Sequence, residues 1–218
     1  MGLTAIRRFL DWTPLWIVVV VLGGIALADR LFPPPMARAY DLSPTMTDVD
    51  GRLLRAGISP AGYWRLSIEL ADVDSHYVQA LLAFEDQRFY RHHGIDYRGM
   101  ARAVVTSLGA RRLVSGGSTL TMQTARLLEP RPNRTVGAKI MEILRAWQLE
   151  RRYTKEEILA MYLNTVEYGS NSFGIQVAAQ TFFNKLPSEL DYQESASLIG
   201  SINKPTRYNP VYNPNDAK

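Results

Sequence analysis

The first side chains able to do chemistry are two adjacent carboxylates, Glu85 and Asp86, at the end of an apolar stretch. A carboxylate placed among apolar side chains can act as a general base or a general acid. His92 and His93 follow, but two adjacent residues cannot easily turn both rings toward one metal ion, so no histidine metal site is predicted. A Glu-Asp pair is also a common solvent-exposed helix end, so this segment alone does not identify a reaction.

A second group of polar side chains follows the glycine pair Gly116-Gly117 and precedes an expected helix. It consists of Ser118, Thr119, Thr121 and Gln123. Backbone N–H groups and hydroxyls at a helix start can hold the oxygens of a phosphate. A simple loop in which Ser118 or Thr119 caps the helix would explain the same residues, and it is the commoner arrangement.

A third group lies on one predicted helix, where Lys139, Glu142, Ala146 and Glu150 are three or four residues apart. This spacing places their side chains on one face. Arg126 and Arg134 are candidates for a cationic cluster near that face. An ordinary salt-bridged helix surface has the same spacing, so the pattern alone leaves both interpretations open.

The apolar periodicity and turn residues predict a mainly α-helical domain that would position these groups. Helices are expected over about 73–94, 136–152, 155–164, 175–183 and 192–202. Thr154 and Glu157 have the spacing of a capping box. A small hairpin is expected around Asp50-Gly51, and a second β-like run over 63–68. Residues 97–115 form an amphipathic, basic stretch that suits either a lipid headgroup layer or a solvated helix face.

The N-terminal segment predicts a membrane anchor. The chain carries no charge from Trp12 to Ala28 and has Arg7 and Arg8 before this stretch. At ~1.5 Å per residue the stretch covers roughly 25 Å of a ~30 Å hydrocarbon core. The basic flank would stay in the cytoplasm and the remaining chain would be exported. A cleaved signal peptide is the alternative, because Ala26-Leu27-Ala28 has the form of a cleavage site.

Composition limits the classes of partner. The 218 residues carry a net charge of +4, which suits anionic lipid or a diphosphate and gives no basic tract for nucleic acid. The chain has no cysteine, which excludes disulfides, thiolate nucleophiles and cysteine zinc sites. The length suits one soluble domain with an anchor.

Taken in order, these segments resemble the family 51 glycosyltransferase domain of class A penicillin-binding proteins and monofunctional transglycosylases. The first family motif, E-D-x-x-F-x-x-H-x-G, is met by Glu85, Asp86, Phe89, His92 and Gly94. The second, G-G-S-T-[IL]-T-x-Q, is met by residues 116–123. The third and fourth are met by Lys139, Glu142, Ala146, Leu149 and Glu150, and by Lys155, Ile158, Leu159, Tyr162, Leu163 and Asn164. One departure is Ala138, where many members have Arg, and Arg134 is a candidate to replace it.

The resemblance implies a mainly α, lysozyme-like glycosyltransferase domain with a small membrane-associated jaw, preceded by an N-terminal transmembrane helix. The basic stretch between the first two motifs resembles that jaw. The expected organisation is a cytoplasmic N-terminus (1–11), the transmembrane anchor (12–32), a linker with the start of the hairpin (33–52), the glycosyltransferase domain (53–210) and a C-terminal tail or linker (211–218).

The resemblance also implies an activity, the polymerisation of lipid II into glycan strands. The growing strand on undecaprenyl diphosphate is the donor, and the GlcNAc 4-hydroxyl of lipid II attacks it with inversion. Glu85 would be the base, and Lys139 with Arg126 would stabilise the diphosphate. Glu142 is the second catalytic candidate, which either orients the cations or holds a divalent ion such as Mg²⁺; no tightly bound cofactor is expected. Further substrate-binding residues would be Asp86, Phe89, His92, Ser118, Thr119, Gln123 and Asn164.

The implied location is the outer face of a bacterial cytoplasmic membrane, reached by a single-pass anchor. The implied partners are lipid II, the lipid-linked glycan, the membrane and other cell wall synthesis proteins. Ser201 to Lys204 has the form S-x-x-K, but the chain has no K-T-G motif, so we interpret it as coincidence. Whether a transpeptidase domain follows stays open.

Two alternatives differ in class from a polymerase. A lysozyme-like peptidoglycan hydrolase or lytic transglycosylase would share the helical fold and a single catalytic glutamate. A non-catalytic envelope scaffold would keep the fold and lose the charged site residues.

Overall fold

A computed structural model describes residues 16–20, 22–24, 26–50, 52–109, 117–133 and 135–203. Contacts divide the chain into two units, Met1–Pro34 and Pro35–Lys218. In the first unit, residues 16–20, 22–24 and 26–31 are helical. Within the described segments, no helix combines the length and the apolar character that a membrane span needs. The expected cytoplasmic N-terminus (1–11), part of the expected anchor (12–32) and the C-terminal tail (211–218) lie outside the described residues.

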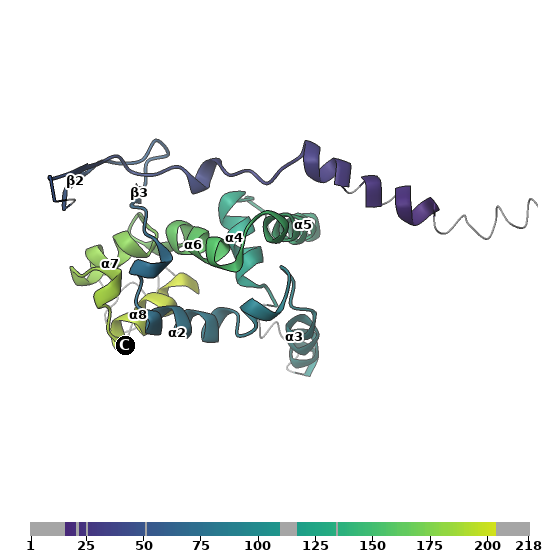
Figure 1. The fold of residues 1–218 in the computed structure, drawn as a ribbon. Helices are drawn as coiled ribbons and strands as arrows, with labels where there is room; N and C mark the ends of the chain where they lie inside the picture. The colour runs from purple at the N-terminus through teal and green to yellow at the C-terminus, as the bar shows by residue number, and fades with distance from the viewer. Residues whose placement is uncertain are drawn as a thin grey trace, which may run out of the picture. The chain divides into compact units, whose positions relative to one another are not determined.

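The second unit is mainly helical, as the sequence predicts (Figure 1). Its α-helices are α2 (Ser75–Glu85), α3 (Tyr97–Gly109), α4 (Leu120–Leu128), α5 (Val136–Arg152), α6 (Lys155–Thr165), α7 (Ile175–Phe183) and α8 (Tyr192–Asn203). Short 3-10 turns are η1 (Ala37–Ala39), η2 (Leu70–Asp72), η3 (Phe89–Arg91) and η4 (Pro187–Glu189). The predicted bounds of α5 and α7 are confirmed, and α6 and α8 each extend one residue further. The single helix expected over about 73–94 is wrong in its extent, because α2 ends at Glu85 and only the turn η3 follows before Gly94.

Two small sheets accompany the helices. The predicted hairpin is confirmed as the antiparallel pair β1 (Thr45–Thr47) and β2 (Leu53–Ala56). Of the β-like run over 63–68, only β3 (Trp64–Arg65) is a strand. It pairs in parallel with β5 (Ser172–Phe173), which pairs antiparallel with β4 (Glu167–Gly169).

Side-chain caps fix where the site-bearing helices begin. Thr119 accepts a hydrogen bond from the backbone N–H of Met122, and Thr135 accepts one from that of Ala138. The predicted capping box of Thr154 and Glu157 is confirmed at the start of α6. Each cap satisfies backbone donors that have no partner inside the helix. The caps therefore place the first turns of α4, α5 and α6 at defined points in the chain.

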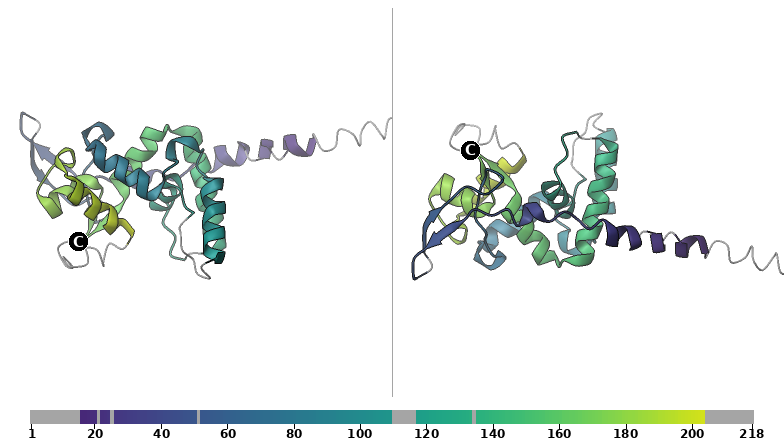
Figure 2. Two further views of the ribbon diagram at one scale, coloured as in Figure 1. Left: turned by 90° about the horizontal axis from the view of Figure 1, so that it is seen from below. Right: turned by 90° about the horizontal axis from the view of Figure 1, so that it is seen from above.

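The hydrophobic core holds these helices in a fixed arrangement. α4 packs against both α5 and α6, and α2 packs against α8 (Figure 2). Fully buried side chains from several of these elements meet in one cluster, among them Tyr77, Leu81, Leu120, Leu149, Ile158, Leu159, Tyr162, Leu163 and Tyr168. Because burying such side chains is the main favourable term in folding, this cluster sets the positions from which the site residues project.

Candidate active site

A cleft of about 320 Å³ lies at the C-terminal end of α2. Glu85, the last residue of α2, lines it and is partly buried. The opposite lining comes from α3 and from the segment that leads into α4, including Ser118 and Thr119. The structure thus brings the first and second sequence motifs to one cleft.

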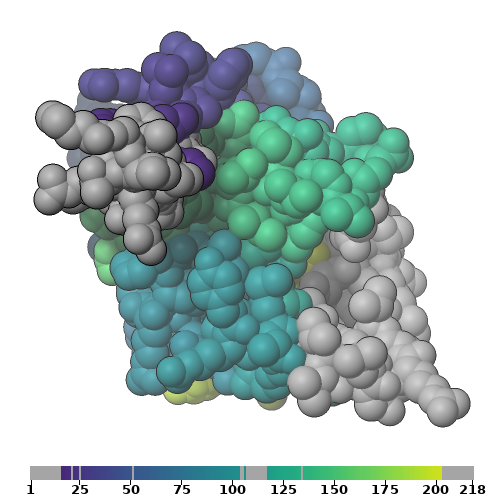
Figure 3. Space-filling model, turned by 90° about the vertical axis from the view of Figure 1, so that its right-hand side faces the viewer, coloured from purple at the N-terminus to yellow at the C-terminus, as the bar shows by residue number. Residues whose placement is uncertain are grey.

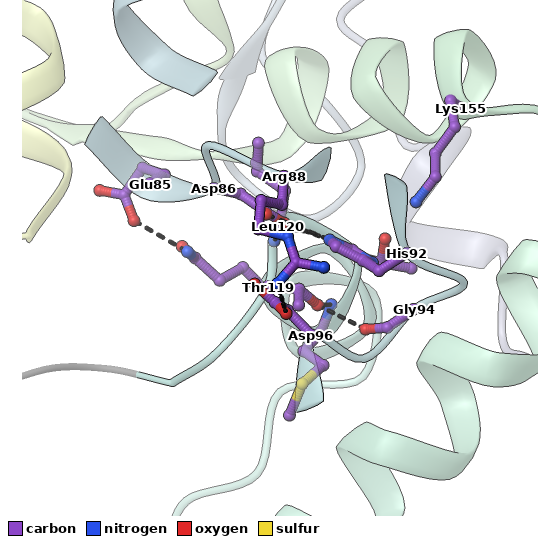
Figure 4. Close-up of polar contacts among 12 residues, drawn as sticks. Glu85, Asp86, Arg88, His92, Gly94, Asp96, Thr119, Leu120 and Lys155 are labelled. Atoms are coloured by element: carbon purple, nitrogen blue, oxygen red, sulfur yellow. Dashed lines mark hydrogen bonds and ion pairs between the residues drawn. The ribbon is translucent and has the colours of Figure 1, made fainter. Parts of the chain in front are cut away.

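Glu85 is held by a side chain from the second motif. The amide Nε2 of Gln123 donates to Glu85 Oε2 at 2.8 Å (Figure 4). Gln123 lies on the first turn of α4, so the position of the carboxylate depends on where that helix begins. The predicted substrate contact of Gln123 stays a prediction, and its amide N–H has an internal partner.

Asp86 ties the loop after α2 to the start of α4. Its carboxylate lies 2.9 Å from Nε2 of His92 and accepts the backbone N–H of Leu120, also at 2.9 Å (Figure 4). Asp86 and His92 are only 6% and 7% exposed. Their predicted contact with substrate stays untested, and the contacts seen are those of positioning residues.

Replacing Asp86 by Ala is expected to lower the free energy of unfolding by about 2–6 kcal/mol. The change would leave the ring N–H of His92 and the backbone N–H of Leu120 buried without an acceptor, and each such loss costs ~1–3 kcal/mol. Urea unfolding followed by circular dichroism in detergent would measure it. Asp72→Ala, at an exposed position, is the control and should change the value by less than ~0.5 kcal/mol. A loss below 1 kcal/mol for Asp86→Ala would contradict the positioning role.

Thr119 caps α4, and its hydroxyl has internal partners. Its predicted substrate contact stays a prediction. Its Oγ1 donates to the carbonyl of Gly94 at 2.6 Å and accepts the N–H of Met122 at 3.2 Å. Gly94, which accepts this bond, has a φ of +84°, a conformation that favours glycine. A Cβ at this position would also lie only 3.3 Å from the backbone of Ala146. Between the two roles that the sequence left open for Thr119, the structure gives it the capping role.

A cationic group stands beside Ser118. The Nζ of Lys139 donates to Ser118 Oγ at 2.6 Å and to Glu142 Oε2 at 2.9 Å. The Lys139 side chain is 39% exposed, whereas that of Glu142 is 15% exposed. An ammonium group has three N–H donors, and these contacts use two. The structure therefore brings Ser118 of the second motif and Glu142 of the third to the same ammonium group. The predicted catalytic role of Glu142 stays a prediction.

Arg126 lies three residues after Gln123 on α4, so the two side chains share a helix face. Its positive charge acts to lower the pKa of the buried Tyr162 phenol, against the stronger effects of burial and of Glu85, which raise it. The Arg126 charge is thus near enough to act on the Tyr162 phenol. Arg134 lies outside the described residues.

Phe89 and Asn164 have internal partners. Phe89 is 1% exposed in the core, with the Nζ of Lys155 4.4 Å from its ring centre. The amide of Asn164 donates to the carbonyl of Ile68 and accepts its N–H, both at 2.9 Å. A side chain as buried as Phe89 packs rather than contacting a substrate. The contacts of Asn164 fix the segment before η2, and its predicted substrate contact stays a prediction.

Sequence reasoning missed an ion pair that lines the cleft. Arg88 Nη1 lies 3.1 Å from Asp96 Oδ1. Burial acts to raise the pKa of Asp96, but the backbone N–H of Gly99 and the charges of Arg88 and His92 outweigh it, and the pKa is lowered. Arg88 occupies an unspecified position inside the first motif and Asp96 lies just after that motif, so no sequence signal marks the pair.

Across the part of the chain that the structure describes, no group of three or more histidine or carboxylate residues could hold a metal ion. Glu142, the one residue suggested for Mg²⁺, is paired with Lys139.

The structure thus defines a mainly helical domain whose cleft is lined by the Glu85 carboxylate and by Ser118, the hydroxyl that accepts from Lys139. A family model described as Transglycosylase matches residues 51–218. The chain therefore belongs to the transglycosylase family, the family 51 glycosyltransferases. The expected domain, 53–210, lies within the matched range.

Several class A penicillin-binding proteins are relatives of the chain. It is 40% identical to penicillin-binding protein 1C of Escherichia coli (strain K12), over 84% of this chain and 24% of the relative. It is 34% identical to penicillin-binding protein 1A of Pseudomonas aeruginosa, over 95% and 26%. It is 40% identical to penicillin-binding protein 2D of Bacillus subtilis (strain 168), over 72% and 22%. The chain spans about a quarter of the length of these relatives.

Proposed function

We propose that the chain is a peptidoglycan glycosyltransferase that polymerises lipid II into glycan strands. Family membership supports this reaction class. The observation that carries the proposal is that one short segment, residues 118–123, contacts both the candidate base, Glu85, and the candidate cation, Lys139. Gln123 bonds Glu85, and Ser118 bonds Lys139. A reaction that removes a proton at one point and expels a diphosphate at another needs these two groups at a fixed separation.

In the proposed reaction, Glu85 takes the proton of the GlcNAc 4-hydroxyl of lipid II. The hydroxyl oxygen then bonds to the anomeric carbon of the donor strand from the face opposite the diphosphate, and the configuration inverts. The bond between that carbon and the diphosphate oxygen breaks, and its electron pair stays with the diphosphate. Lys139, with Arg126, stabilises the negative charge that develops there. Mg²⁺ stays a prediction, as a companion of the substrate diphosphate, and no step depends on it.

The test is polymerisation of fluorescent lipid II by the detergent-solubilised chain, with products separated by length. We expect a ladder of glycans that a muramidase digests to small fragments. A parallel reaction with preformed glycan distinguishes the polymerase from the alternative enzyme class, the lysozyme-like hydrolase or lytic transglycosylase. If the folded chain forms no ladder and shortens preformed glycan, the proposed polymerase is wrong and the lysozyme-like hydrolase or lytic enzyme replaces it. If it does neither, the non-catalytic scaffold replaces it.

We also propose that the domain works at the outer surface of the cytoplasmic membrane, anchored by residues 12–32. The outer face of α5 supports contact with lipid. Val136, Ile140 and Leu144 are 79%, 53% and 47% exposed and lie four residues apart, on one side of the helix. Further along this side, the Arg151 guanidinium lies 4.6 Å from the Trp147 ring centre. Tryptophan and arginine with apolar neighbours are typical of the lipid headgroup boundary. Figure 3 shows a face on which α5 and α3 are both exposed.

A polarity-sensitive dye at position 140 is expected to report a lipid environment. Because the chain has no cysteine, Ile140→Cys gives a single labelling site in the full chain. In lipid vesicles the dye emission should shift to the blue, and lipids with nitroxide headgroups should quench it. Val49→Cys, on the hairpin turn, is a matched control that should keep the emission seen in water. Equal emission and equal quenching at positions 140 and 49 would contradict the proposed contact of α5 with lipid.

A further inference from the structure

A buried ion pair joins two of the site-bearing helices, and the proposed reaction does not use it. The Nζ of Lys155, the first residue of α6, donates to Oε1 of Glu150, near the end of α5, at 2.6 Å. The two side chains are 15% and 6% exposed. Charges withdrawn from water in this way destabilise the fold unless they keep their partners. The pair therefore constrains the groups that contact it.

The same carboxylate oxygen also holds the start of α4. Thr121 Oγ1 donates to Glu150 Oε1 at 2.6 Å, and Thr121 is 0% exposed. The ammonium group of Lys155 lies in addition 4.4 Å from the ring centre of Phe89 in η3. The contacts of Glu150 and Lys155 thus connect one side chain from each of the four sequence motifs.

The segment at the start of α4 is attached to α5 at two points. Ser118, just before α4, accepts from Lys139, and Thr121 donates to Glu150. About 16 Å of helix separates Lys139 from Glu150, at ~1.5 Å per residue. Two polar contacts this far apart on α5 oppose both rotation and sliding of the segment. Apolar packing between the helices has no preferred direction and opposes such movements less.

We infer that Glu150 is a positioning residue whose buried carboxylate fixes the start of α4 against α5. Gln123 lies on the same first turn of α4 as Thr121 and donates to Glu85. The separation between the candidate base and the candidate cation, Lys139, therefore depends on a contact that includes neither of them. The inference rests on the proposed function for its effect on rate, and on the contacts alone for its effect on α4.

The test compares Thr121→Val with Thr124→Val in the full chain. Both threonines are fully buried on α4, but the Thr124 hydroxyl donates within its own helix, to the Leu120 carbonyl at 2.9 Å. Thr121→Val should lower kcat for lipid II polymerisation by about tenfold, part of the ~10²-fold that a 1 Å misplacement can cost. KM should change by less than about twofold, because the alignment is needed mainly in the transition state.

Two further variants complete the comparison. Thr124→Val should keep kcat within about twofold of the wild type, because it leaves the contact between α4 and α5 in place. Thr121→Ser keeps the hydroxyl and lacks only the methyl group, so it should retain most of the wild-type kcat. If Thr121→Val keeps the wild-type rate, or if either of the other two variants loses as much as Thr121→Val, the positioning role is wrong.

A second measurement needs no activity and separates this inference from the proposed function. In Glu150→Leu/Lys155→Met, apolar side chains of similar size replace the ion pair, a change that folded proteins often tolerate. In the wild type, Thr121→Val should lower the melting temperature by about 3 °C or more. In the apolar variant it should not lower it further, because the hydroxyl has already lost its acceptor. Thr124→Val should have the same effect in both chains.

The outcomes distinguish the two proposals. If the wild type makes no glycan but the effect of Thr121→Val disappears in the apolar variant, Glu150 holds α4 and the polymerase proposal fails. If the effect is the same in both chains, Glu150 does not hold α4 and the positioning role is overturned, whatever the activity. If the apolar variant does not fold, the kcat values of the three threonine variants decide.

Discussion

Replacing Glu85 by Gln is expected to lower glycan polymerisation by roughly 10²–10⁴-fold, the range typical for loss of a general base. Glutamine has the same shape, and its oxygen can still accept the Gln123 N–H that Glu85 Oε2 accepts at 2.8 Å. It cannot take a proton from the acceptor hydroxyl. The loss should therefore appear in kcat, while the unfolding transition stays where it is in the wild type.

The measurement is the initial rate of fluorescent lipid II consumption. Glu156→Gln, an exposed carboxylate on α6, is the matched control and should keep wild-type activity. A Glu85→Gln variant that retains more than a tenth of the wild-type rate would exclude Glu85 as the base.

Replacing Lys139 by Met is expected to have the second largest effect, a loss of roughly 10²–10³-fold in kcat, typical for removal of one group that stabilises transition-state charge. Methionine matches the unbranched lysine chain as far as Cε and lacks the ammonium group that donates to Ser118 and Glu142. Because the ion pair is partly exposed, stability should change by less than ~1 kcal/mol. Arginine at this position should restore only part of the rate, since its planar group cannot reproduce the same contacts.

The same kcat assay tests this prediction against Lys185→Met. Lys185 has a similar exposure and pairs with Glu194 at 2.7 Å near the start of α8. Its replacement should leave polymerisation unchanged. Equal losses in the two variants would mean that the effect of Lys139 is general charge or stability, and would contradict its role at the diphosphate.

The sequence predicted α5 to α8 to within one residue because their signals are local, whereas the helix expected over 73–94 is cut short at Glu85. α5 has an apolar stripe over several turns and a threonine at its start, and α6 has the Thr154 capping box. β4 and β5 were not predicted, because strands of two or three residues are defined by their pairing. β4 pairs with β5, and β5 pairs with β3, which lies about a hundred residues earlier in the chain. The turn that joins them carries Ser170 and Asn171 at positive φ, which a sequence pattern of this length does not specify.

The candidate site was predictable as a set of residues but not as a set of contacts. Family resemblance named Glu85 and Lys139, and spacing placed Lys139 beside Glu142. The partner of each charged group depends on how separate segments pack. The hydrogen bond from Gln123 to Glu85 and the ion pair of Arg88 with Asp96 therefore had no signal in the sequence. For the same reason the buried roles of Phe89 and Asp86 became visible only in the structure.

The most direct measurement of the central claim is the release of undecaprenyl diphosphate from lipid II, counted against the glycosidic bonds formed. The proposed transfer predicts one diphosphate released for each new bond, with both quantities lost together in Glu85→Gln. A hydrolase or lytic enzyme acting on glycan breaks bonds between sugars and releases no polyprenyl diphosphate. If a folded wild-type chain forms or breaks glycosidic bonds without releasing undecaprenyl diphosphate, the account is contradicted.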